Sequence, residues 1–279
     1  MDILKLAAFS YNNQGGNPAG VVFYDEFPAA EEMMGIAKEI GYSETAFLVK
    51  QNDGWRVRYF APELEVPFCG HATIALGAAL GEKFGENTYK LILNDSEISV
   101  RAEKSAHGIS ATLQSPPTKS EDAPKEFVQK ILTRFDLNDK DLNPNFPVKF
   151  AYVGVGAKFL IIVLQNRKTL ADMKYDFELV KSLMAEQAVI TINLLWNESD
   201  SIFHSRNPFA SGGVYEDPAT GAAAAALAGY LRDIDWKGKN EFTILQGEDM
   251  GMPSRLNVKF TPIKKDSVIV NGEVRHMGE

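Results

Sequence analysis

Four side chains able to do acid–base or nucleophilic chemistry stand in short motifs of the 279-residue chain. Glu44 lies in SETAFL, Cys69 and His71 lie in FCGHAT, and Asp217 lies in EDPATG. Carboxylates and imidazoles transfer protons, and a thiolate acts as a base or a nucleophile. The residues therefore suggest proton-transfer chemistry, provided that the fold brings them to a substrate.

Each of these residues also has a structural interpretation. Glu44 could be a solvated loop residue between a helix end and an apolar strand, and His71 could satisfy a local carbonyl. Asp217 could cap the helix that follows it, with Pro218 in the first turn. Cys69, the only cysteine, is either a buried small residue or a reactive thiol in a reducing compartment. The residue types alone leave both interpretations open.

Several kinds of site are not expected. The four histidines are scattered and neither HExxH nor CxxC occurs, so no metal is predicted. The stretch GVGAK at 154–158 lacks the third glycine of a dinucleotide loop. A net charge of −8 and a pI near 5.2 argue against a nucleic-acid surface. The start has no basic leader or long apolar stretch, which predicts a cytoplasmic protein without a membrane span.

Two segments of Ala, Gly and Leu follow FCGHAT and EDPATG and are expected to be helices. A helix that is apolar on every side does not lie on a surface. Small residues would let a strongly curved sheet wrap around it at native packing density. The free N–H groups and the positive dipole end at each helix start would then form an anion site. If the two starts faced one cleft, that cleft would suit a small carboxylate.

The chain is expected to form two domains of similar construction. A proline-rich and charged stretch at 114–124 marks the boundary, and aligning Cys69 with Thr220 gives a faint internal repeat. The predicted domains are 1–116, joined by the tail 267–279, and 117–266. Amphipathic helices are expected at 29–41, 125–135 and 177–187, among mostly antiparallel strands.

Five motifs in order give the chain a resemblance to a known family: GNPAGVV, SETAFL, FCGHAT, EDPATG and a late QG…PS. The series resembles that of the phenazine-biosynthesis PhzF-like isomerases, over nearly the whole chain. The resemblance implies an α+β fold like that of diaminopimelate epimerase. In this fold two pseudo-symmetric domains each roll a mostly antiparallel sheet around a central helix. It also implies an active site between the domains, a homodimer and no cofactor.

The resemblance implies roles for individual residues. Glu44 would carry the proton, while His71 and Asp217 would complete the catalytic set by holding polar groups of the substrate. The remaining substrate-binding positions would be these: Asn17, Gly70, Thr73, Gly221 and Ala222.

The function expected from the sequence is a cofactor-independent isomerase that shifts a proton within a small cyclic or unsaturated amino acid or carboxylate. A two-thiol epimerase is disfavoured, because Thr220 stands opposite Cys69 in the repeat. Ala222 and Met252 replace a serine and an arginine of the family pattern, which leaves the natural substrate open. The alternative is a non-catalytic protein that binds a small ligand or a partner on the same fold.

Overall fold

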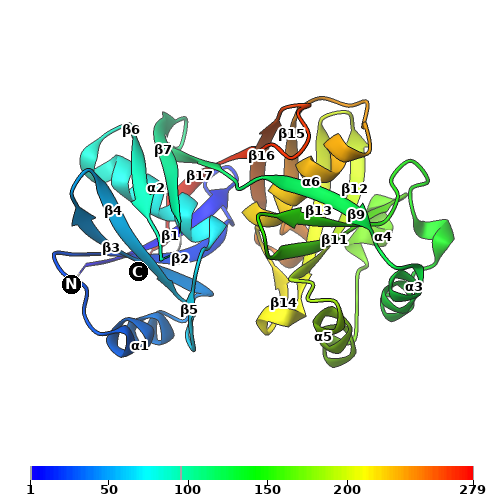
Figure 1. The fold of residues 1–279 in the computed structure, drawn as a ribbon, viewed down its shortest axis with the longest axis horizontal. Coiled ribbons are helices and arrows are strands. Elements are labelled where there is room, and N and C mark those ends of the chain that lie inside the picture. The colour runs from blue at the N-terminus through cyan, green and yellow to red at the C-terminus, as the bar shows by residue number, and fades with distance from the viewer. Residues whose placement is uncertain (1, 95, 279) are drawn as a thin grey trace. The chain divides into compact units, whose positions relative to one another are not determined.

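The chain forms two compact units in the computed structural model, which describes residues 2–94 and 96–278 (Figure 1). Unit 1 contains Met1–Gln114, Met252–Arg255 and Asn271–Glu279. Unit 2 contains Ser115–Gly251 and Leu256–Val270. The domain ranges expected above stay predictions.

The compact units differ from those ranges mainly in one short segment, Met252–Arg255, which belongs to unit 1. Its attachment has a local cause, because the Gly16 N–H donates to the Pro253 carbonyl at 3.2 Å and Ser10 pairs with Ser254. The break after Gln114 falls at the start of the proline-rich stretch.

Unit 1 is built on a mixed sheet with two helices, α1 (Ala30–Ile40) and α2 (Gly70–Phe84). Antiparallel pairs predominate, but β2 and β3 run parallel, as do β4 and β6. The end of β17 (Val268–His276) pairs with β1 in antiparallel fashion. The other strands of this unit are β1 (Ile3–Ser10), β2 (Asn17–Tyr24), β3 (Glu44–Gln51), β4 (Gly54–Phe60), β5 (Glu65–Val66), β6 (Asn87–Ile92), β7 (Glu97–Ser105) and β8 (Gly108–Gln114).

Helix α2 is the core of unit 1 (Figure 1). Every residue from His71 to Gly81 is buried, and the helix contacts β1, β2, β3, β6, β7 and β8. A Cβ atom at Gly77 would lie 2.5 Å from Val100 Cγ2, and one at Gly81 would lie 2.6 Å from Ala102 Cβ. The strands therefore approach the helix more closely than any larger side chain would allow.

Unit 2 repeats this construction around α6 (Gly221–Asp233). Its strands pair mostly antiparallel, with parallel pairs β11–β12 and β13–β15. The elements are β9 (Thr118–Asp122), α3 (Lys125–Arg134), β10 (Lys149–Val153), β11 (Ala157–Leu164), α4 (Arg167–Ala171), α5 (Phe177–Glu186), β12 (Thr191–Ser199), β13 (Ile202–Phe209), β14 (Val214–Asp217), β15 (Glu241–Gln246) and β16 (Ser254–Phe260). Three 3-10 turns complete it: Asp139–Asp141, Ala210–Gly212 and Glu248–Met250.

Helix α6 is buried from Ala223 to Arg232 and contacts β9, β10 and β11. A Cβ atom at Gly229 would lie 2.5 Å from Thr118 Cβ, so this helix also needs small residues. Arg232 ends the buried stretch and donates to the Thr118 carbonyl at 2.9 Å. The predicted α+β class, with a mostly antiparallel sheet around a central helix in each half, is confirmed.

The helices expected at 29–41, 125–135 and 177–187 are α1, α3 and α5. Gly41 ends α1 in the left-handed region, at φ 72°, where a glycine fits best. Across 2–94 and 96–278, no helix has both the length and the apolar character that a bilayer crossing requires.

Candidate active site

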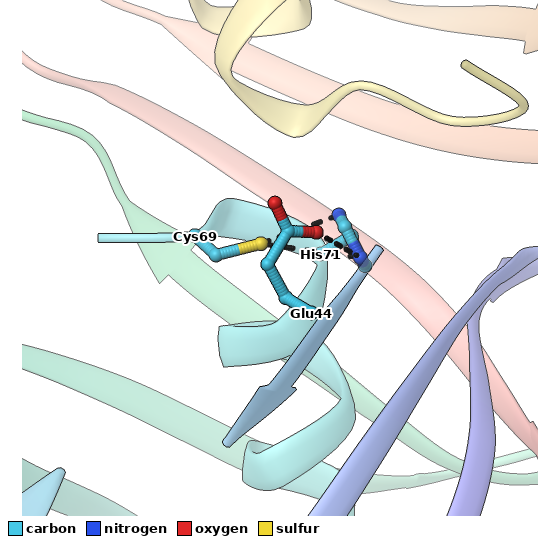
Figure 2. Close-up of side chains that lie close together, drawn as sticks. All are labelled: Glu44, Cys69 and His71. Atoms are coloured by element: carbon cyan, nitrogen blue, oxygen red, sulfur yellow. Dashed lines mark hydrogen bonds and ion pairs between the residues drawn. The ribbon is translucent and has the colours of Figure 1, made fainter. Parts of the chain in front are cut away.

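Three side chains with ligand or acid–base chemistry converge at the start of α2 (Figure 2). Glu44 is the first residue of β3, followed by four buried residues that fix the strand in the core. Cys69 precedes α2 in an extended conformation, and His71 is the second residue of that helix. Two rigid elements therefore hold the three groups together.

The distances within this cluster are short. Glu44 Oε2 lies 3.3 Å from His71 Nε2, and Cys69 Sγ lies 3.4 Å from Nδ1 and 3.9 Å from Nε2 of the same ring. Ser43 Oγ forms a 3.3 Å hydrogen bond with Nε2. Glu44 Oε2 is buried and takes part in no hydrogen bond with the described residues. One carboxylate oxygen thus faces the imidazole at ion-pair distance but without a hydrogen bond.

Thr73 fixes the start of α2 through buried hydrogen bonds. Its side chain is fully buried, and its hydroxyl donates to the Cys69 carbonyl at 2.6 Å. The Tyr59 hydroxyl lies 2.7 Å from the Thr73 hydroxyl oxygen. Burial raises the pKa of Tyr59 well above its usual value, so this phenol stays neutral. Thr73 and Tyr59 together fix the position of the turn that carries Cys69 and His71.

The first turn of α2 presents backbone N–H groups without a side-chain cap. Cys69 makes no capping hydrogen bond and no acidic residue lies in the turn. Gly70 is its first residue, and Asn17, at the start of β2, is buried in the same unit. The unit-1 residues expected at the site are thus Asn17, Glu44, Gly70, His71 and Thr73, and the structure joins His71 directly to Glu44.

The residues expected from the second motif lie in unit 2, at the start of α6. Asp217 ends β14, Thr220 is the N-cap residue, and Gly221 and Ala222 open the helix. The Thr220 hydroxyl donates to Asp217 Oδ2, and Thr220 makes no capping hydrogen bond with its side chain. The N-cap position of α6 is thus taken by Thr220, three residues after Asp217.

Gln246 holds this turn in place. Its side chain is 2 % exposed, and Nε2 donates to the Asp217 carbonyl at 2.7 Å and to Thr220 Oγ1 at 3.1 Å. Its Oε1 accepts from the Thr220 N–H at 3.3 Å. Gln246 begins the late QG…PS motif, but its role as a clamp on the Asp217 turn was not apparent from the sequence.

Glu216, the residue before Asp217, forms a buried ion pair with Arg206. Arg206 donates from Nε to Glu216 Oε1 at 3.0 Å and from Nη2 to Oε2. Its Nη1 donates to the Ala171 carbonyl at 2.8 Å. Burial by itself would lower the pKa of Arg206, but pairing with Glu216 outweighs burial and raises it. Sequence reasoning missed this pair; the signal available was the acidic residue beside Asp217.

Sequence spacing also missed that Cys69 lies beside Glu44. The two residues come from different elements, so no local motif joins them. Thiol, imidazole and carboxylate donor atoms lie within 4.8 Å of one another, a set that can hold a metal ion. The same set can transfer a proton, because a carboxylate with free lone pairs lies next to an imidazole.

The family model for phenazine biosynthesis-like proteins matches residues 6–277. An uncharacterized isomerase of Mesorhizobium japonicum, mll1393, is 30% identical over 272 residues, which cover 91% of this chain and 88% of the relative. An uncharacterized isomerase of Bacillus subtilis, YfhB, is 28% identical over 269 residues, covering 92% and 90%. Shared ancestry with such relatives makes this chain an enzyme of the isomerase class.

Solved structures agree on the fold. A phenazine biosynthesis protein of the PhzF family from Bacillus anthracis superposes with a TM-score of 0.86 at 23% identity, covering 99% of this chain and 96% of that one. A hydroxyproline epimerase from Agrobacterium vitis gives 0.62 at 12% identity, covering 99% and 89%. With the match over residues 6–277, the chain belongs to the phenazine biosynthesis-like (PhzF) family.

Proposed function

We propose that the protein is a cofactor-independent isomerase in which Glu44 moves a proton within a small cyclic or unsaturated amino acid or carboxylate. Glu44 takes a proton from one carbon, the double bond shifts, and the same carboxyl returns a proton to another carbon. The substrate gains and loses one proton, so no oxidant or co-reactant is needed. One residue serves both half-steps because the base becomes the acid after the first transfer.

The observation that carries this proposal is the buried Glu44 Oε2, which lies beside His71 but makes no hydrogen bond with the described residues. A buried carboxylate oxygen without a hydrogen bond is costly, so it calls for a partner such as a substrate proton. The imidazole of His71 at 3.3 Å gives the carboxylate a polar neighbour. A purely structural glutamate at this position would be expected to bond to the backbone or to face solvent.

His71 and Asp217 are proposed to hold polar groups of the substrate. Uncapped N–H groups at the starts of α2 and α6 support a carboxylate ligand, with Gly70, Gly221 and Ala222 at those starts. Asp217 is fixed by Thr220 and can accept from a substrate amine or hydroxyl. Asn17 is proposed to contact the substrate, whereas the engaged hydroxyl of Thr73 fits a supporting role.

Two residues that differ from the family motif affect which substrate is proposed. Ala222 offers a methyl group where a serine hydroxyl is common, and Met252 stands in place of an arginine. We therefore propose a less polar substrate than the phenazine precursor. A cysteine that forms no disulfide fits a reducing, cytoplasmic location, and the homodimer implied by the resemblance is kept as part of the proposal.

The test is deuterium uptake from heavy water into small unsaturated and cyclic carboxylates, followed by NMR. Glu44→Gln keeps the size of the side chain but cannot exchange a proton, so the exchange rate should fall by about 10²–10⁴-fold. Glu39→Gln makes the same change at an exposed position of α1 and should exchange at the wild-type rate.

Exchange that persists in Glu44→Gln would move the base elsewhere. A wild type that binds a carboxylate by calorimetry, yet incorporates no deuterium into any compound of the panel, would instead favour a non-catalytic binding protein.

A further inference from the structure

We propose that Glu44, Cys69 and His71 form a binding site for a thiophilic divalent cation such as Zn²⁺, and that the bound cation switches the enzyme off. The binding half of this inference stands on geometry alone. The inhibitory half rests on the proposed function, because it requires Glu44 to be the proton carrier.

The three side chains supply the ligand types that zinc prefers: a thiolate, an imidazole nitrogen and a carboxylate oxygen. In a tetrahedral site with Zn–N of about 2.0–2.1 Å and Zn–S of about 2.3 Å, neighbouring ligand atoms lie roughly 3.3–3.7 Å apart. His71 Nε2 is 3.3 Å from Glu44 Oε2 and 3.9 Å from Cys69 Sγ. All three ligand atoms lie within 4.8 Å of one another, so side-chain shifts of about an ångström would close the site around an ion.

The ring nitrogen proposed to bind the ion is Nε2, which faces Glu44 at 3.3 Å and lies 3.9 Å from Cys69 Sγ, although Sγ is closer to Nδ1, at 3.4 Å. Nε2 also forms the 3.3 Å hydrogen bond with Ser43 Oγ, which cation binding would break. The loss is small beside three metal–ligand bonds, because a hydrogen bond contributes only about 0.5–1.5 kcal/mol net.

Glu44 Oε2 gives an independent reason to expect a cation here. The atom is buried and takes part in no hydrogen bond with the described residues, so apart from the His71 ring at 3.3 Å nothing compensates its desolvation. A divalent cation would compensate it directly. The ligands also sit on the first residue of β3 and the start of α2, which hold them in place before the ion arrives.

Other histidine–carboxylate pairs of the described chain differ from this cluster. His107 lies 3.0 Å from Glu273 and His276 lies 2.9 Å from Glu82, both on the surface and without a thiol. Among residues 2–94 and 96–278, Glu44, Cys69 and His71 are the one set of three such donors. The surface pairs therefore supply matched controls for weak, non-specific cation binding.

Cation binding would stop proton transfer by occupying the base. Coordination takes the lone pair of Glu44 that would accept the substrate proton, and the thiol of Cys69 releases its own proton to solvent as the bond to the metal forms. Three protein ligands leave a fourth position for water or a substrate oxygen. The isomerase would thus be active as the free protein and inhibited by zinc.

The decisive measurement is titration with Co²⁺, a spectroscopic substitute for Zn²⁺. Wild-type protein should bind one equivalent and develop a thiolate-to-cobalt charge-transfer band, which excess Zn²⁺ removes. Cys69→Ala should lose the band, and Zn²⁺ binding by calorimetry should weaken by at least about tenfold. His276→Asn should behave as the wild type.

A second variant is needed because Cys69→Ala could lose the band by misfolding. Glu44→Gln keeps the thiol and should keep a charge-transfer band at saturation, with weaker Co²⁺ binding. Absence of a band in the wild type, or a band that survives in Cys69→Ala, overturns the site.

Inhibition is measured separately, as the Zn²⁺ concentration that halves each variant's own zinc-free rate. That concentration should rise at least about tenfold in Cys69→Ala, and a chelator should restore the wild-type rate. An active wild type that zinc does not slow overturns the inhibitory half. If no substrate is found, the proposed function fails, while the cobalt band still decides the metal site.

Discussion

At the scale of the residue, His71 connects the proton carrier to the start of α2. Its imidazole contacts Glu44, Ser43 and Cys69, so its loss should disturb substrate binding more than the chemical step. A hydrogen bond to a charged group contributes about 1.5–3 kcal/mol. In His71→Asn, KM should therefore rise roughly ten- to a hundredfold, with a smaller fall in kcat. Steady-state kinetics check this, with His276→Asn as the surface control; a fall in kcat alone would contradict it.

Gln246 should matter for stability through the turn that holds Asp217. Gln246→Leu would leave the Asp217 carbonyl and the Thr220 N–H and hydroxyl without this partner in a buried place. The expected loss in the free energy of unfolding is about 1–3 kcal/mol, measured with urea. Gln51→Leu, at an exposed position, should change it by less than about 0.5 kcal/mol. Equal losses in both variants would show that the clamp contributes nothing.

The site residues differ in how far the sequence could indicate them. Glu44 and His71 stand in motifs, so their roles could be expected from the resemblance, and these roles stay predictions. The approach of Cys69 to Glu44 could not be expected, because it depends on how β3 packs beside α2. The ion pair of Arg206 with Glu216 was not predicted either, because an arginine in a strand usually faces solvent rather than a buried glutamate.

At the scale of the element, the small residues of α2 and α6 are a packing requirement. In Gly77→Ala the new Cβ would meet Val100 Cγ2 at 2.5 Å and Ala111 Cβ at 3.0 Å. Overpacking should destabilise the fold by about 1–3 kcal/mol. This loss should exceed the stability gained from the higher helix propensity of alanine, which is at most about 1 kcal/mol. Gly35→Ala in α1 meets nothing within 4 Å and should stabilise the protein. Thermal unfolding of the two variants tests this, and stabilisation by both would refute tight packing around α2.

The positions of the helices and strands along the chain were largely predictable, whereas the pairing of the strands was not. Apolar spacing indicated α1, α3 and α5, and composition indicated that α2 and α6 are buried. The parallel pairs β2–β3 and β11–β12 were not foreseen. Strand patterns show which face of a strand is buried but not which strand lies beside it, since pairing is set by the path of the whole chain.

At the scale of the whole molecule, the deeply buried Tyr59 of unit 1 and Tyr230 of unit 2 should contribute to the alkaline limit of stability. Burial raises the pKa of Tyr59 and of Tyr230 far above the usual value of about 10. Above that pH the unfolded chain loses these protons while the folded chain keeps them, so stability is present below about pH 10 and falls as pH rises.

Each of these tyrosines can contribute up to about 1.4 kcal/mol per pH unit to that fall. Tyr59→Phe should be less stable at neutral pH, because it loses the contact with Thr73, but should show a shallower alkaline decline. Urea unfolding measured from neutral to strongly alkaline pH tests this. A decline of unchanged steepness in both Tyr59→Phe and Tyr230→Phe would mean that other groups set the limit.

Strand β17 has a consequence for the order in which the protein folds during synthesis. Its residues Glu273–His276 pair with β1, yet they leave the ribosome after the whole of unit 2. Until then the sheet of unit 1 lacks this neighbour, and β1 keeps an unpaired edge to which other chains can add. Unit 2 can complete its core first, which reverses the usual order of folding from the N-terminus. Emergence of β17 from the ribosome, rather than emergence of Gln114, is then the step that closes unit 1.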